Sequence, residues 1–174
     1  FDQQKVYRIK WYDHGTYSKL YWQSPKYDTT GNTTIHRTAN EAEAAKFIIR
    51  SVENSTGKFY LYDVVSQQYV IPSGNSSNGT AWTWSAKTLG KTAITESGEA
   101  FTISSTAEGY ANAYANDNND GDVKNYGSGS KWAIEEAGEN TATFGIAPQA
   151  VYRLTHHNTN RYRYLASEPS NEGY

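Results

Sequence analysis

Two tryptophans separated by a single residue, Trp82 and Trp84, form the most suggestive chemical pattern in the sequence. On a strand, residues two apart share a face, so both indole rings would lie on the same side of a sheet. A flat aromatic face suits the C–H surface of a sugar ring, and Asp or Asn side chains pair with its hydroxyl groups. The predicted binding set in this region is Trp82, Trp84, Asp63, Asn75 and Asn78. The alternative interpretation places the two tryptophans in the core, where they cap the end of a barrel.

Two other regions have a similar composition. Near the start of the chain, Asp13 precedes the adjacent aromatic residues Tyr21 and Trp22. Adjacent residues on a strand face opposite ways, so only one of these rings can be core and the other can meet a ligand. Asp117 lies in a polar run that follows a third aromatic segment. Trp22, Asp13 and Asp117 therefore complete the predicted ligand-binding set.

Metal sites and catalytic sites have no convincing pattern. Residues 116–121 resemble the start of a calcium loop, but the twelfth position is Gly127 where such a loop has a bidentate acid. His156 and His157 are adjacent, so on a strand they cannot chelate one ion together. No nucleophile elbow, phosphate loop or His-Glu-x-x-His motif occurs. We expect no metal, no cofactor and no enzymatic activity.

Composition limits the partners and the compartment. The chain has 174 residues with a net charge of −2, which gives no electrostatic argument for binding nucleic acid. It contains no apolar run long enough to span a bilayer, so no membrane insertion is expected. Cysteine and methionine are both absent, and the first residue is Phe1. We expect a processed chain, or a piece of a longer one, that is secreted or displayed at a cell surface.

Short aromatic runs between Gly, Asn, Ser and Asp clusters predict an all-β protein. Three aromatic opening strands are predicted at residues 6–11, 59–64 and 109–114, and three closing strands at 46–49, 100–103 and 131–134. Each closing strand carries an aromatic residue and an Ile two positions apart. This internal repeat predicts a β-trefoil, in which six strands close a barrel and three hairpins cap it, with Phe47, Phe101 and Trp132 converging on its axis. A β-sandwich is the alternative.

The last stretch of the chain lies outside the three predicted units. Residues 149–154 and 163–169 echo residues 6–9 and 19–25. We therefore predict a β-trefoil over residues 5–146, followed at 147–174 by a C-terminal extension or the start of a further β unit.

The pattern over residues 5–137 resembles the ricin-type β-trefoil lectins, whose units open with an aromatic strand and close on a Gln-x-Trp motif. Ala45, Glu99 and Ser130 stand where the motif has Gln, and Phe47 and Phe101 replace the Trp in two units. Residues 130–137 also resemble the end of modules appended to secreted bacterial glycan-processing proteins. The resemblance implies a non-catalytic carbohydrate-binding module of a secreted or cell-surface bacterial protein, with a glycan as its ligand and a neighbouring domain as a possible partner. The alternative is a protein-interaction or spacer module without a glycan ligand.

Overall fold

The computed structural model describes residues 1–12, 15, 19–73, 79–106, 110–113, 121–126, 129–141, 155–158 and 161–164. Contacts divide the chain into two units, Phe1–Thr141 and Ala142–Tyr174. The second unit contains an antiparallel hairpin of β13 (Thr155–Asn158) and β14 (Arg161–Tyr164). The boundary predicted between residues 146 and 147 falls outside the described residues and stays a prediction.

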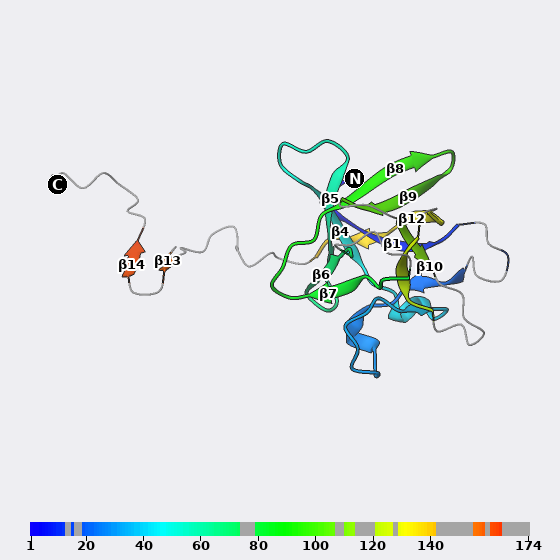
Figure 1. Cartoon of the computed structure of the whole chain (residues 1–174), viewed down its shortest axis with the longest axis horizontal. Coiled ribbons are helices and arrows are strands. Elements are labelled where there is room, and N and C mark those ends of the chain that lie inside the picture. Colours follow the sequence, from blue (N-terminus) through cyan, green and yellow to red (C-terminus); the bar gives the residue numbers. More distant parts are fainter. Residues whose placement is uncertain are drawn as a thin grey trace. The chain divides into compact units, whose positions relative to one another are not determined.

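The described part of the first unit is all-β, as predicted, and twelve strands in it belong to one sheet. Short 3-10 turns lie between strands at Pro25–Tyr27 and Glu41–Glu43. No helix in the described part of the chain is long and apolar enough to cross a membrane. The strands are β1 (Lys5–Trp11), β2 (Tyr21–Trp22), β3 (Arg37–Thr38), β4 (Phe47–Ser51), β5 (Lys58–Asp63), β6 (Gln68–Ile71), β7 (Thr83–Ser85), β8 (Thr92–Ser97), β9 (Ala100–Ser105), β10 (Tyr110–Ala113), β11 (Val123–Tyr126) and β12 (Lys131–Glu139). Figure 1 shows β1, β4, β5, β8, β9 and β12 gathered in this unit.

Six of these strands pair in a ring. The antiparallel pairings run from β1 to β4, β5, β8, β9 and β12, and β12 pairs again with β1. The ring is only partly closed by hydrogen bonding, because β1 and β4 share a single residue pair and two other junctions share two pairs each. Pairing in a ring leaves few open strand edges, which reduces the risk of edge-to-edge aggregation.

The remaining six strands form three hairpins, β2–β3, β6–β7 and β10–β11, each attached to a strand of the ring. The hairpins meet in a cycle of three backbone hydrogen bonds. Ile35 N–H donates to Trp82 at 3.0 Å, Trp82 N–H to Val123 at 2.8 Å, and Val123 N–H to Ile35 at 2.8 Å. All three residues are fully buried, so the cycle satisfies backbone groups that no water reaches.

The register of the predicted repeat needs correction in its second and third units. The segment predicted as the second closing strand is β9, which pairs with β10 as β1 pairs with β2. The second closing strand is instead β8, where Thr92 is fully buried and donates to the carbonyl of Phe59 at 3.1 Å. The segment predicted as the third opening strand contains β10, a hairpin strand. Because β8 has no aromatic residue, its sequence gave no sign of a closing strand.

The core is built around tryptophans and the inward residues of the ring. Phe47 and Trp132 are fully buried and pack edge-on against Trp22, at centroid distances of 6.0 and 5.3 Å. Phe101 does not join them, contrary to the prediction. Its half-buried ring instead contacts Phe1 at 5.8 Å. Thr92 occupies the position in β8 that Phe47 occupies in β4, which explains why only two rings meet here.

Candidate functional site

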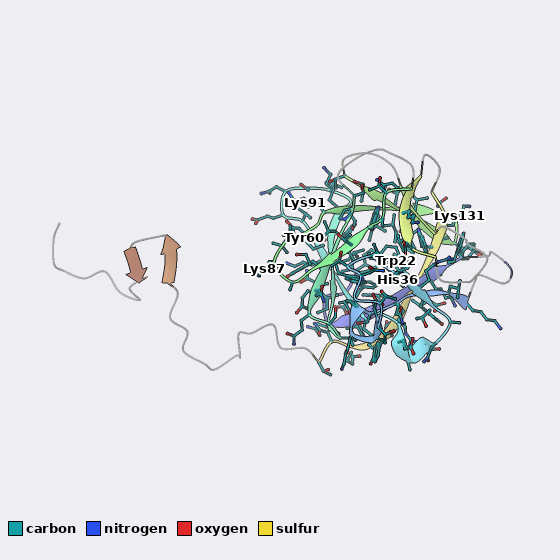
Figure 2. All side chains as sticks on the ribbon, turned by 60° about the horizontal axis from the view of Figure 1, so that its bottom comes forward. Trp22, His36, Tyr60, Lys87, Lys91 and Lys131 are labelled. Carbon is teal, nitrogen blue, oxygen red and sulfur yellow. The ribbon has the colours of Figure 1, made fainter. Side chains whose placement is uncertain are left out.

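The three tryptophans of the predicted binding set lie in the core. Trp22 and Trp82 have 0% of their surface exposed and Trp84 has 5%. Trp22 lies among the side chains of the first unit in Figure 2, and its ring packs against that of Trp82 at 6.2 Å. Trp84 stacks on Phe47 at 5.9 Å. In this structure the three rings are core residues, because their strands turn them inward. They do not form the exposed stacking platform that was the other interpretation of the sequence.

Asp63 is also buried, and hydrogen bonds to its carboxylate explain its position. Ser24 Oγ and Ser66 Oγ donate to it at 2.6 and 2.7 Å, and the backbone N–H of Lys46 donates at 2.9 Å. The N–H groups of Val65 and Ser66 donate at 3.2 Å. These donors fix the turn after β5 and leave the carboxylate no open side for a ligand. The other predicted residues, Asp13, Asn75, Asn78 and Asp117, lie outside the described residues and stay predictions.

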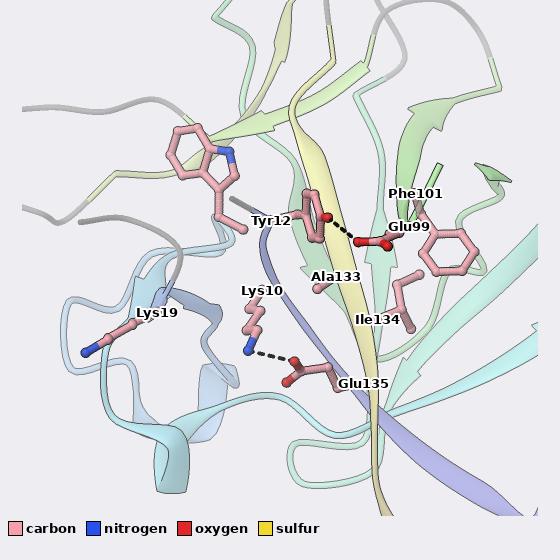
Figure 3. A pocket seen from close by; sticks show the side chains of 9 residues that line it. Lys10, Tyr12, Lys19, Glu99, Phe101, Ala133, Ile134 and Glu135 are labelled. Carbon is pink, nitrogen blue, oxygen red and sulfur yellow. Dashed lines mark hydrogen bonds and ion pairs between the residues drawn. The ribbon is translucent and has the colours of Figure 1, made fainter. Parts of the chain in front are cut away.

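An open hollow of about 830 Å³ provides a different candidate site (Figure 3). Its walls come from β1, from the turn between β8 and β9, from β12, and from the segment before β2. The described residues that line it are Lys10, Trp11, Tyr12, Lys19, Glu99, Phe101, Ala133, Ile134 and Glu135. The hollow therefore combines aromatic and apolar walls with four charged groups.

Tyr12 and Glu99 form the central polar contact of the hollow. Trp11 is buried at the end of β1, so the next residue, Tyr12, faces outward. Its backbone N–H donates to the carbonyl of Lys131 at 2.9 Å, which fixes it against β12. The Tyr12 hydroxyl donates to Glu99 Oε2 at 3.0 Å, as the dashed line in Figure 3 shows. This contact holds the tyrosine ring at the wall of the hollow.

Lys10 and Glu135 form a second pair on the neighbouring strands β1 and β12. The distance from Lys10 Nζ to Glu135 Oε1 is 2.6 Å, and this hydrogen bond raises the pKa of Lys10 above its usual value. The ammonium group also lies 5.8 Å from the centre of the Tyr21 ring. Lys19 lies apart from Phe101 and Glu99 in Figure 3 and is exposed. Carboxylate acceptors, ammonium donors and ring faces are thus within one hollow, which is the combination that suits hydroxylated ligands.

Sequence reasoning missed this hollow, although one signal pointed to it. In β1 the inward residues are Ile9 and Trp11, so simple alternation places Lys10 and Tyr12 on the outer face. The partners Glu99 and Glu135 come from segments far along the chain. Their proximity follows from the pairing of β12 with both β1 and β9.

Within the described ranges, no three His, Cys, Asp or Glu side chains gather to hold an ion.

Comparison with known proteins gives a likeness of fold without a likeness of sequence. No family model matches the chain, and neither does any curated protein. The structure is similar to a Polyporus squamosus lectin bound to a human-type influenza-binding epitope, with a TM-score of 0.61 and 11% identity, over 78% of this chain and 50% of that one. The chain thus spans about half the length of that lectin. At this identity the likeness shows a shared all-β fold.

Two further solved structures have a similar fold. A mutant of the Bauhinia bauhinioides kallikrein inhibitor, complexed with bovine trypsin, matches with a TM-score of 0.55 and 11% identity, over 78% of this chain and 91% of that one. Cry35Ab1 matches with a TM-score of 0.59 and 13% identity, over 92% of this chain and 43% of that one. The names of these proteins point to different activities, so the function of this chain must be argued from its own residues.

Proposed function

We propose that the first unit is a β-trefoil that acts as a non-catalytic carbohydrate-binding module, with the hollow around Tyr12 and Glu99 as its glycan site. As the resemblance of residues 130–137 implies, the module would belong to a secreted or cell-surface bacterial protein. The hydrogen bond from Tyr12 to Glu99 beside the half-buried ring of Phe101 is the observation that carries the proposal.

The trefoil assignment is supported by the pairing of the strands. Six strands pair in a ring, three hairpins attach to alternate members of it, and the hairpins join through a cyclic set of hydrogen bonds. Tyr21, Tyr69 and Tyr110 are the cross-strand partners of Lys10, Tyr62 and Ser104 in three successive units. The same residue type at the same register position in each unit is what a threefold repeat would produce.

The hollow offers the groups that a sugar requires. Glu99 uses Oε2 to accept from Tyr12, so its second oxygen can accept from a sugar hydroxyl. Lys19 can donate from the opposite wall, while Phe101 and Ile134 supply apolar surface for the C–H face of the ring. Both carboxylates of the hollow already have hydrogen-bond donors, Tyr12 for Glu99 and Lys10 for Glu135. This engagement suits a binding role better than general acid–base catalysis.

The test begins with the full chain on a broad glycan array, followed by titration of each bound glycan. Tryptophan fluorescence is a suitable signal because Trp11 lines the hollow. Tyr12→Ala is expected to weaken binding by about tenfold or more, equivalent to about 1.4 kcal/mol. Tyr27→Ala is the matched control, because Tyr27 is an exposed tyrosine outside the hollow, and its variant should bind normally.

Three results would count against the proposal. Absence of any saturable glycan binding would overturn the glycan-binding function and leave a protein-interaction or spacer module. Binding that is insensitive to Tyr12→Ala would remove the hollow as the site. Release of cleavage products from a bound glycan would exclude a non-catalytic module.

A further inference from the structure

Three aromatic rings occupy the same position on three strands of the ring. Ile9 in β1, Leu61 in β5 and Ile103 in β9 are buried in the core. Two residues earlier on the same faces lie Tyr7, Phe59 and Phe101. All three of these side chains are half-buried and pack against the core cluster. They therefore form one aromatic layer at an end of the six-strand ring, which we call the aromatic socket.

Phe1 inserts its ring into this socket. Its centroid lies 5.4 Å from that of Tyr7, 5.5 Å from that of Phe59 and 5.8 Å from that of Phe101. The contacts with Tyr7 and Phe59 are edge-on, with interplanar angles of 76° and 84°. Edge-to-face contacts at such distances are favoured by the quadrupoles of aromatic rings.

Hydrogen bonds between its backbone and both backbone and side-chain partners hold the segment that carries Phe1. The N–H of Asp2 donates to the hydroxyl of Tyr7 at 2.9 Å, and the N–H of Lys5 donates to the carbonyl of Asp2 at 3.2 Å. Asn140 Nδ2 donates to the carbonyl of Gln3 at 3.0 Å. Phe1 nevertheless keeps 46% of its surface exposed, so its ring sits at the mouth of the socket.

From this geometry we propose that the aromatic socket is a binding site for a single small aromatic ring, and that Phe1 occupies it in cis. Each wall comes from a different strand, so a ring bound in the socket contacts β1, β5 and β9 at once. The site is built for an aromatic ligand because three ring walls offer edge and face contacts that an aliphatic side chain cannot reproduce. The proposal does not depend on glycan binding, since the hollow and the socket share only Phe101.

The experiment is chemical rescue of the Phe1→Ala variant of the full chain. Benzyl alcohol mimics the missing side chain, and cyclohexylmethanol is its saturated counterpart of similar size. Thermal unfolding of Phe1→Ala should shift upward saturably with benzyl alcohol. At ten times its dissociation constant, the ligand should lower the unfolding equilibrium constant about elevenfold. Cyclohexylmethanol should give a clearly smaller shift, and the unsubstituted protein should show no saturable shift with either.

Leu89→Ala is the matched control, because Leu89 is 53% exposed and removing it also deletes an exposed apolar side chain. Benzyl alcohol should not rescue it. If Phe1→Ala folds poorly, the yield of folded protein in the presence of each alcohol is measured instead. Benzyl alcohol should then raise this yield more than cyclohexylmethanol does. Equal effects of the two alcohols, equal rescue of Leu89→Ala, or no saturable effect on Phe1→Ala would each overturn the proposal.

Discussion

The indole N–H of Trp82 donates a hydrogen bond to Oδ1 of Asn125 at 2.6 Å, and both residues are fully buried. The bond joins the second hairpin, β6–β7, to β11 in the third hairpin, β10–β11. The backbone N–H of Asn125 also donates to the carbonyl of Thr80 at 2.9 Å, so the two segments are fixed by backbone and side chain together. Trp82 thus stabilises the contact between hairpins from inside the core.

Trp82→Phe is expected to destabilise the protein because it removes this bond and leaves Oδ1 of Asn125 without its indole donor. The lost hydrogen bond alone should lower the free energy of unfolding by about 1–3 kcal/mol. Urea denaturation followed by circular dichroism measures the change.

Trp22→Phe is the control for the lost volume. Trp22 is equally buried, but its Nε1 is without a hydrogen-bond partner among the described residues. Its replacement removes an unsatisfied donor along with part of the ring, so it should cost less than Trp82→Phe. The reverse order would show that the Trp82–Asn125 bond contributes little.

His36 and Asp122 are half-buried and connect the first and third hairpins. His36 Nδ1 lies 2.7 Å from Asp122 Oδ1, and the two residues also form a backbone bridge. A double-mutant cycle with His36→Ala and Asp122→Ala should give a coupling energy of about 0.5–3 kcal/mol, as found for residues in direct contact. Urea denaturation of the two single variants and the double variant measures it. Additive effects would mean that the side chains do not stabilise the junction.

Gly90 is required because of a close approach to the end of β6. A Cβ at this position would lie 2.2 Å from the carbonyl oxygen of Val70 and 2.8 Å from Cα of Ile71. Gly90→Ala must therefore move backbone, and we expect a loss of about 1–3 kcal/mol or more in unfolding free energy.

Gly98 provides the contrast to Gly90. It has φ = +67° with open space around its Cα. Asn tolerates this left-handed conformation, so Gly98→Asn should be nearly neutral while Gly90→Asn should be severe. Similar effects of the two Asn variants in thermal unfolding would contradict the steric explanation.

The sequence predicted four of the six ring strands but misassigned a fifth for a physical reason. An aromatic residue two positions before an aliphatic one predicts a closing strand in the repeat, as in Phe47 and Ile49. The same spacing occurs in the opening strands, in Tyr7 and Ile9 and in Phe59 and Leu61, because both kinds of strand bury alternate residues. Phe101 and Ile103 therefore fit either kind, and only strand pairing distinguishes them.

The candidate site was harder to predict than the fold. Tryptophan suits both a core and a stacking platform, and the sequence does not say which face of a strand is inward. The side chains of the hollow come from β1, the turn between β8 and β9, and β12. Lys10 and Glu135 illustrate the difficulty, because their contact arises from the pairing of β1 with the last strand of the ring.

Loss of the phenol proton of Tyr62 should make the protein less stable in alkaline solution than at neutral pH. Burial raises the pKa of Tyr62, with smaller contributions from the neighbouring Tyr69 and Asp63. The unfolded chain therefore loses this proton at a lower pH than the folded chain, near pH 10. Between the unfolded and folded pKa values the unfolded state binds fewer protons, so the free energy of unfolding falls as pH rises. Tyr62→Phe removes the titrating group and should make that fall shallower.

Chemical denaturation at a series of pH values from 8 upward to about 11 measures this slope, since the reference pKa of tyrosine is about 10. Tyr27→Phe is the matched control, because Tyr27 is exposed and no other aromatic ring covers it in the part of the chain that the structure describes. Its variant should follow the unsubstituted protein. Because the Tyr69 ring packs against that of Tyr62 at a centroid distance of 4.8 Å, tilted by 51°, burial of the Tyr62 phenol depends on this pair, and Tyr69→Ala should also reduce the loss of stability at alkaline pH. A slope that is the same with Tyr62 and with Phe at this position would show that the hydroxyl is as well hydrated in the folded chain as in the unfolded one.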